Sequence, residues 1–465
     1  MQLSQQPTGH PSAAVADCLS CTSGLRLKLE LEMKLRNMKR NRNRTIHLTA
    51  LGACLGAAIT GSVAWPARAD SAADAGRLAK VEQENKDLKQ RLDALEGLAQ
   101  KEGLLTSGQP APKFAKALSN LSISGFVQAS YFYNTARPAD GKSAAYLWNT
   151  TDNSFSINKV KLTLASPPVE RSGDKFDAGF RVSMIWGEDA PVLNTGSPGA
   201  GFEPLREAYV DLNVPLGTGL NVKAGQLISL LNYESGDGGA ANANFSQGNQ
   251  WFFTGNGPAA GVQLGYTITD WLDVTARVQN GLYGGPVDMN SAKTFLGSLG
   301  FKPDSKTWIN LIGFAGDGTP VSKSVQGGSV LAGRQWTPQF NTGLEFDYFN
   351  FGPAGGGPGK DLWSIGGWVG YDFTPKVGLA FRGEYLNDVD GYGIKGVGFP
   401  GRAGSAIVSP NANGDLYGLT LTLNLRVTSN LKLQPEVRYD RTSYTGGLDG
   451  KNDRFIVGLG ATYLF

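Results

Sequence analysis

The sequence has very little cysteine and histidine, and neither occurs after residue 69. All three cysteines (Cys18, Cys21 and Cys54) and both histidines (His10 and His47) lie in the first 69 of 465 residues. The remaining chain therefore cannot form disulfides, Cys/His zinc sites, or Ser-His and Cys-His catalytic pairs. We expect no cofactor, no metal site and no enzyme of these kinds.

The sequence also lacks a strong excess of either positive or negative charge once residues 1–69 are set aside. That segment holds nine of the 43 Lys and Arg residues and three of the 40 Asp and Glu residues, which leaves 34 basic against 37 acidic side chains. The positive excess of the whole chain thus belongs to its first segment. We therefore expect no nucleic-acid partner.

Residues 1–69 are predicted to be an N-terminal extension with a signal peptide that is removed. A basic cluster at 39–44 precedes eighteen uncharged residues at 48–65, and the small-x-small site Ala67-Arg68-Ala69 follows. This order is typical of a secretory signal peptide. One alternative is an uncleaved signal anchor, and another is a lipoprotein cleavage box at 51–54.

Residues 70–100 are predicted to form a short periplasmic coiled coil, followed by a Gly- and Pro-containing linker at 101–120. Apolar residues recur at alternating spacings of three and four, interrupted by one asparagine, which is the seam of a coiled coil. The seam consists of Leu78, Val81, Asn85, Leu88, Leu92 and Leu95. So short a helix is marginal alone, so we expect it to pair between copies. We expect a homotrimer, although the seam itself does not fix the number of copies. The alternative is an amphipathic helix on the barrel or the membrane.

The remaining chain, 121–465, alternates between apolar and mixed positions. In the last strand, Phe455, Val457, Leu459, Ala461, Tyr463 and Phe465 form one apolar face. A period of two indicates an extended strand, and aromatic residues at both ends of an apolar face are typical of strands that cross a bilayer. The predicted fold class is all-β: a transmembrane antiparallel β-barrel in outer-membrane lipid. A soluble β-sandwich or propeller would also alternate.

Fifteen strands are visible from this alternation. They begin with 121–134, 153–165, 176–186, 204–214, 220–230, 259–268, 272–282, 293–302, 306–315, 338–349, 361–373, 377–387, 414–427 and 431–443, and end with 453–465. Short turns belong on the periplasmic side of such barrels and long loops outside. The turns at 374–376 and 428–430 fall on the wrong side unless one more strand is inserted, at 325–334 or within 350–360. We therefore predict sixteen strands.

Three local expectations follow from the same pattern. Pro435 lies in the middle of a strand, where a closed barrel has no free edge, so we expect a bulge there. Trp186 and Trp368 are expected to face lipid. The loop 232–258 contains Glu234 and several aromatic residues, among them Tyr233. We expect this loop to fold into the lumen and narrow it. The alternative is that it caps the barrel mouth or the oligomer.

The positions opposite the apolar face carry charges of both signs in nearly equal number. The predicted pore-lining residues are Arg181, Glu207, Asp211, Lys223, Arg277, Glu345, Asp347, Arg382, Glu384, Arg426, Lys432, Glu436, Arg438, Asp440 and Arg454. A sixteen-stranded barrel is wide enough for a water-filled channel, so we expect these charges to be solvated without needing buried partners. Strong ion selectivity is not expected, because no ladder of one sign is present.

Four segments resemble the putative β-barrel porin-2 (OmpL-like) family. They are 207–217 (EAYVDLNVPLG), 222–226 (VKAGQ), 232–234 (NYE) and 382–388 (RGEYLND). The resemblance covers about residues 121–465 and implies an outer-membrane channel. The preceding coiled coil is similar to that of trimeric porins with a periplasmic coil.

The leading functional hypothesis is an outer-membrane porin for passive diffusion of small hydrophilic solutes or ions through a mixed-charge lumen. The alternative is a structural or adhesive anchor, with a plugged barrel and a periplasmic tether. An enzyme barrel is a third class, disfavoured because no histidine follows residue 69.

Overall fold

The computed structural model describes residues 121–144, 148–193, 203–287, 290–317, 322–353, 358–389 and 414–465. The predicted signal peptide, coiled coil and linker lie outside these residues. Among the described residues, no helix is long and apolar enough to cross a membrane.

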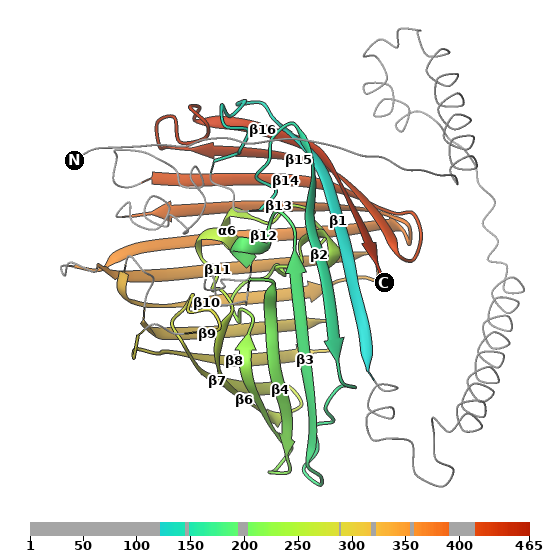
Figure 1. Ribbon diagram of the computed structural model, residues 1–465, viewed down its shortest axis with the longest axis vertical. Helices are drawn as coiled ribbons and strands as arrows, with labels where there is room; N and C mark the ends of the chain where they lie inside the picture. Colours follow the sequence, from blue (N-terminus) through green and yellow to red (C-terminus); the bar gives the residue numbers. More distant parts are fainter. Residues whose placement is uncertain are drawn as a thin grey trace, which may run out of the picture. The chain divides into compact units, whose positions relative to one another are not determined.

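The described chain is a single closed sheet in which every strand pairs antiparallel with its neighbours along the sequence, and β1 pairs with β16 (Figure 1). Its strands are β1 (Ser122–Asn134), β2 (Ser154–Ala165), β3 (Asp177–Trp186), β4 (Leu205–Val214), β5 (Leu220–Leu227), β6 (Ala259–Thr269), β7 (Leu272–Gln279), β8 (Thr294–Asp304), β9 (Thr307–Asp317), β10 (Ser322–Gln335), β11 (Phe340–Pro353), β12 (Lys360–Thr374), β13 (Val377–Asp388), β14 (Gly414–Arg426), β15 (Leu431–Thr442) and β16 (Asp453–Leu464). The prediction of a sixteen-stranded antiparallel barrel is confirmed. The short helical pieces are α5 (Ala190–Leu193), η1 (Gly238–Ala240) and α6 (Asn249–Phe253).

The additional strand required by parity is β10, at the first of the two predicted positions. Arg334 pairs with Thr307 of β9 on one side and with Thr342 of β11 on the other. Because β10 is antiparallel to both, β9 and β11 run in the same direction and could not pair directly in an antiparallel sheet. With β10 in place, short connections alternate with longer ones. We call the two ends of the barrel the short-turn end and the long-loop end.

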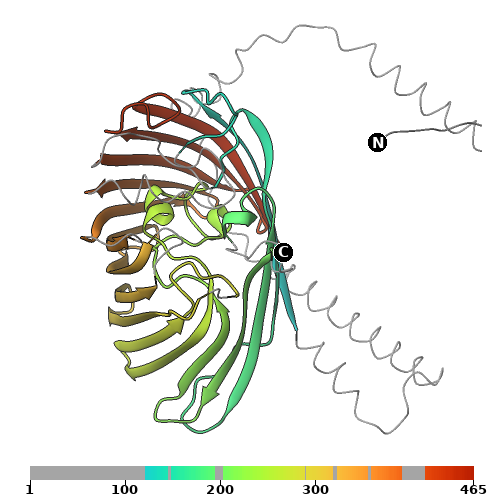
Figure 2. The ribbon, with the colours of Figure 1, turned by 60° about the vertical axis from the view of Figure 1, so that its left-hand side comes forward.

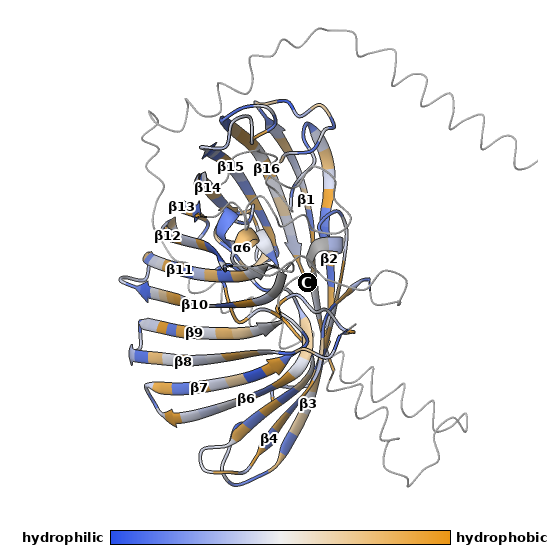
Figure 3. Ribbon diagram, turned by 90° about the vertical axis from the view of Figure 1, so that its left-hand side faces the viewer, coloured by the Kyte–Doolittle hydropathy of each residue, from blue (hydrophilic) through white to orange (hydrophobic). Residues whose placement is uncertain are grey.

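Side chains alternate between the outer surface and the interior along the strands. Figure 3 shows the accompanying bands of hydrophobic and hydrophilic residues. On β16, Phe455, Val457 and Leu459 are exposed on the outside, whereas Arg454 and Ile456 are buried inside. An apolar side chain left on a surface is favourable where that surface meets lipid. The ladder closes at its seam, where Gly125 and Phe465 exchange backbone hydrogen bonds of 2.9 and 3.0 Å.

The expected bulge at Pro435 is wrong. The register to β16 is continuous from Leu431 to Arg441, and the pairs to β14 on both sides of the proline share one register. The chain instead leaves a gap in the β14 ladder opposite Gln434 and Pro435. The sheet therefore accommodates the missing N–H of Pro435 by leaving out ladder pairs to β14, and the strand contains no inserted residue of the kind that forms a bulge.

The expectation for Trp368 is also wrong, whereas Trp186 is exposed on the outer face. Trp368 is buried, and its indole N–H donates to Glu234 at 3.1 Å inside the barrel. Trp363 and Trp368 are five residues apart on one strand, and an odd separation places side chains on opposite faces. Trp363 takes the outer face, where it packs against Phe346 and Tyr385.

This assignment predicts opposite responses to lipid-borne quenchers. Trp186→Phe should lower the fraction of tryptophan emission quenched by brominated lipid, because it removes an outward indole. Trp368→Phe should raise that fraction, because it removes an indole that the lipid cannot reach. Fluorescence of the two variants in vesicles measures the difference, and changes in the same direction would contradict the assignment of the two faces.

Candidate functional site

The fifteen predicted pore-lining residues occupy inward positions, but the structure divides them by exposure. Ten are buried: Glu207, Arg277, Glu345, Asp347, Arg382, Glu384, Glu436, Arg438, Asp440 and Arg454. Five remain partly exposed: Arg181, Asp211, Lys223, Arg426 and Lys432. The expectation that these charges are solvated and need no partner is therefore wrong for the larger group. A role in conduction stays a prediction for all fifteen.

The cause of the burial is the segment Asn232–Pro258, here called the crossing loop. It leaves the wall after β5 and returns to it at β6, yet it contacts strands from β11 round to β16 and on to β2. β5 and β13 are eight places apart in a ring of sixteen, so the loop spans the barrel. Figure 2 shows it inside the curve of the strands. The prediction that this loop folds into the lumen is confirmed.

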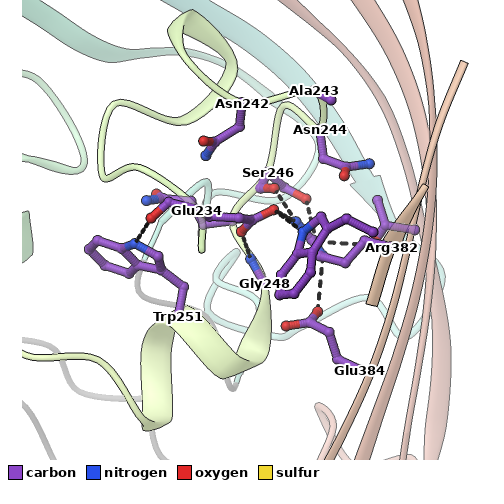
Figure 4. A network of polar contacts seen from close by, with 12 residues as sticks. Glu234, Asn242, Ala243, Asn244, Ser246, Gly248, Trp251, Arg382 and Glu384 are labelled. Atoms are coloured by element: carbon purple, nitrogen blue, oxygen red, sulfur yellow. Dashed lines mark hydrogen bonds and ion pairs between the residues drawn. The ribbon is translucent and has the colours of Figure 1, made fainter. Parts of the chain in front are cut away.

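Arg382 on β13 is the centre of the contact (Figure 4). Its guanidinium donates to a carboxylate oxygen of Glu234 and to the carbonyl of Ser246, both at 2.7 Å. It also forms a 3.0 Å ion pair with Glu384 on its own strand. Arg382 is 0% exposed, so these groups replace water around the charge. A buried charge is stable only when it is paired and hydrogen-bonded in this way.

Carboxylates of the wall accept hydrogen bonds from the loop backbone. Glu436 accepts from the amide of Phe245 at 2.8 Å and from that of Ser246 at 3.3 Å. Glu384 accepts from the amide of Gln250 at 2.9 Å. Amides of the irregular loop and of the first turn of α6, which have no partner in a regular ladder, thus find charged acceptors, which form stronger hydrogen bonds than neutral ones.

Arg438 on β15 completes this wall. It donates to the carbonyl of Gln247 at 2.8 Å and to the side chain of Asn249 at 2.6 Å, and it pairs with Asp440 at 2.8 Å. Asp440 in turn pairs with Arg454 at 3.3 Å. Arg382 and Arg438 therefore hold the loop, whereas Arg454 pairs with Asp440 of the wall.

A second set of contacts holds the loop to β11. Asp347 accepts from Thr254 at 2.7 Å and from Gln250 at 2.8 Å, and Glu345 accepts from the amide of Tyr233 at 2.8 Å. On the opposite side, Lys161 pairs with Asp237 at 2.7 Å.

Apolar packing fixes the middle of the crossing loop. The Phe245 ring lies against Gly460, where an added Cβ would come within 2.1 Å of it. The same ring stacks on Phe132 with centroids 5.7 Å apart, and Ile456 completes the small cluster. A side chain at Gly460 would therefore displace Phe245.

The long-loop end of β8–β14 contains an apolar cluster that the sequence analysis missed. Inward residues there are buried together: Leu296, Ile312, Phe314, Val325, Leu331, Phe349, Phe351, Leu362, Leu386 and Leu416. Phe252 and Phe253 of α6 and Leu282 pack against them. The available signal was that these strand ends are apolar on both faces, which is typical of strands buried on both sides.

The short-turn end of β6–β11 remains open. A cavity of about 800 Å³ lies there, between the turns of these strands and Tyr233 of the crossing loop. Charged residues at its edge keep substantial exposure, including Lys302 at 61% and Arg334 at 37% of their side-chain surface. Lys302 pairs with Asp273 at 3.1 Å, and Arg334 pairs with Asp304 at 3.0 Å.

One further charged pair lies beside the long loops. Lys159 contacts Asp189 at 3.0 Å, and both side chains are almost completely enclosed. Burial raises the pKa of Asp189, and the Lys159 charge acts in the opposite direction. Within the described residues, no group of three or more His, Cys, Asp or Glu side chains could hold a metal ion.

Several solved structures share this architecture. The trimer form of OmpT, an outer membrane protein of Vibrio cholerae, is 12% identical, with a TM-score of 0.50 over 74% of this chain and 99% of that one. OprB of Pseudomonas putida is 12% identical, with a TM-score of 0.50 over 76% and 96%. The outer membrane channel DcaP of Acinetobacter baumannii is 14% identical, with a TM-score of 0.48 over 74% and 97%. At these identities the likeness to OmpT and OprB shows the fold alone. No curated protein sequence matches the chain.

A closed barrel of sixteen antiparallel strands, apolar outside and charged inside, defines the class of outer-membrane porins. The family model described as "Putative beta-barrel porin-2, OmpL-like" matches residues 120–465. The chain belongs to this family, and the protein is a passive diffusion channel of the bacterial outer membrane. Its family and fold are those of a channel rather than of an enzyme.

The contrast between buried and exposed ion pairs predicts unequal effects of two matched substitutions. Arg382→Met should lower the free energy of unfolding by about 3–5 kcal/mol, because it leaves Glu234 and Glu384 charged and unpaired inside the barrel. Arg426→Met should cost about 0–1 kcal/mol, because the Arg426–Asp372 pair is 40% exposed on both sides. Urea unfolding in detergent measures both values, and equal losses would contradict the assigned burial.

Proposed function

We propose that solutes pass along the part of the lumen that the crossing loop leaves open, beside β6–β11, and that the loop sets the width of this path. The cavity at the short-turn end supports this route, because its charged rim is exposed to water. The opposite wall, from β13 to β16, is occupied by the loop through Arg382, Glu436 and Arg438. By the usual orientation of such barrels, the short turns face the periplasm.

The charges along this route favour weak selectivity for small hydrophilic solutes. Three acidic residues (Asp270, Asp273 and Asp304) and three basic ones (Lys302, Lys306 and Arg334) lie at or beside the cavity. Two opposite-charge pairs form among them, so neither a cation nor an anion meets a field of one sign. Arg181, Asp211 and Lys223 on β3–β5 are partly exposed and extend this mixed lining on the side next to β6. Arg426 and Lys432 are also partly exposed, but they lie on β14 and β15, away from this route.

The alternative of a structural anchor with a plugged barrel is favoured by one observation. The apolar cluster at the long-loop end of β8–β14 fills the interior next to α6. Liposome swelling distinguishes the two functions, because vesicles that contain a diffusion channel admit small sugars, whereas vesicles that contain a plugged anchor do not.

Shortening the crossing loop tests the proposed route. Deletion of residues 236–250 should raise single-channel conductance in planar bilayers, because it removes the segment that Arg382 and Glu436 hold in the lumen. Gly460→Leu, which displaces Phe245, should raise it by a smaller amount. Gly313→Leu is the control, since an added Cβ at this position meets nothing within 4 Å.

Unchanged conductance after the deletion would show that the loop does not set the width of the path. Wild-type protein without conductance steps would instead contradict the channel itself.

A homotrimer joined by the seam Leu78–Leu95 remains a proposal, and this segment lies outside the described residues. Association between copies rests on the three–four spacing of the seam and on the small size of one helix, and the number three rests on the likeness to trimeric porins. Removing residues 70–100 should lower the mass of the detergent-solubilised oligomer measured by light scattering and leave the barrel folded. An oligomer of unchanged subunit number would contradict a role of the seam in association.

A further inference from the structure

We propose that the cavity at the short-turn end is a subsite for a neutral saccharide, which stacks one ring on Trp308 and hydrogen-bonds to the polar rim. The inference rests on the proposed diffusion function, because it concerns a solute on the same route. It specifies the chemical class of that solute. The residues that carry it come from the crossing loop and from β8 to β11.

The aromatic part of the site is a row of three rings. Tyr233 stacks with Trp308 on β9 at 5.8 Å between centroids and 15° between planes, and with Trp368 on β12 at 4.5 Å and 26°. Trp368 is buried, whereas Tyr233 and Trp308 line the cavity. Tyr233 lies between two nearly parallel rings, so the aromatic face left for a ligand is the Trp308 face that is turned away from Tyr233.

Inward glycines make room for this row against the wall. A Cβ on Gly333 would come within 2.4 Å of the Trp308 indole nitrogen, and a Cβ on Gly343 within 2.1 Å of the Tyr233 ring. Neither ring could lie where it does if these positions carried a larger residue. The sequence of β10 and β11 is thus fitted to two rings held close to the sheet.

Tyr233 is held in place by the first residues of the crossing loop. Asn232 has a φ of 81°, a left-handed conformation that asparagine tolerates better than most residues. The turn directs the Tyr233 amide to Glu345, which accepts it at 2.8 Å. Because Tyr233 is fixed and stacks on Trp308, the Trp308 ring loses little freedom when a ligand stacks on it.

The polar rim favours a neutral ligand with hydroxyl groups. Lys302 and Arg334 are paired with Asp273 and Asp304, so the rim offers donors and acceptors without a net charge. Asn341 and Gln335 add amide groups to the lining. A sugar ring has an apolar face of C–H groups and an edge of hydroxyls that both donate and accept, which matches an indole face beside such a rim.

The first test uses maltose on the full-length protein in planar bilayers. Maltose should interrupt the ion current reversibly, and Trp308→Leu should raise the half-saturating concentration about tenfold. Trp186→Leu on the lipid face is the matched control and should leave it unchanged. Sorbitol, a linear polyol with hydroxyls but no ring face, should interrupt the current much less than maltose does.

Tryptophan fluorescence in detergent separates this inference from the diffusion function, because it needs no conduction. Titration with maltose should change the emission of the wild type, and this change should weaken in Trp308→Leu. A conducting protein with no maltose response in either assay would overturn the saccharide subsite and leave the channel intact. Equal effects of sorbitol and maltose, or a stronger response to benzoate, would also overturn it.

Discussion

A charge that faces the inside of a barrel must have either water or a partner, and on β13–β16 the partner is the crossing loop. Arg382 and Arg438 donate to loop carbonyls, and Glu384 and Glu436 accept from loop amides. The wall charges supply partners for the backbone groups of the crossing loop, and the loop backbone supplies partners for the wall charges that it covers. The loop has little regular structure of its own, so its backbone depends on the wall, and the enclosed charges of the wall depend on the loop.

This mutual dependence makes the interior asymmetric. From β13 to β16 the lumen is occupied by loop backbone and paired charges, and the long-loop end of β8–β14 is filled by apolar side chains around α6. The short-turn end of β6–β11 keeps a cavity and an exposed charged rim. The protein is therefore a porin with an open cavity on one side of its described lumen, and the proposed route and saccharide subsite both use that side.

Much of the fold could be predicted from sequence, because lipid outside and polar groups inside impose a period of two. Parity required one more strand, at 325–334 or within 350–360, and β10 occupies the first of these positions. The docking partners of the crossing loop could not be predicted, since Glu234 and Arg382 are 148 residues apart and meet only because β5 and β13 lie opposite each other. Nor could a list of inward charges show which of them are buried, because burial depends on where the loop lies. The apolar strand ends did carry a signal, but an aqueous lumen was expected there, and Trp368 was assigned to the wrong face of its strand.

Hydrogen exchange at the backbone amides of the crossing loop tests the central interaction most directly. The amides of Phe245, Gly248 and Gln250 each donate to a buried carboxylate. In the wild-type protein they should exchange as slowly as amides of the neighbouring strands, because opening them requires breaking charge-assisted hydrogen bonds in a buried site. Exchange at the rate of an exposed loop would contradict a loop held across the lumen by the charges of β13–β16.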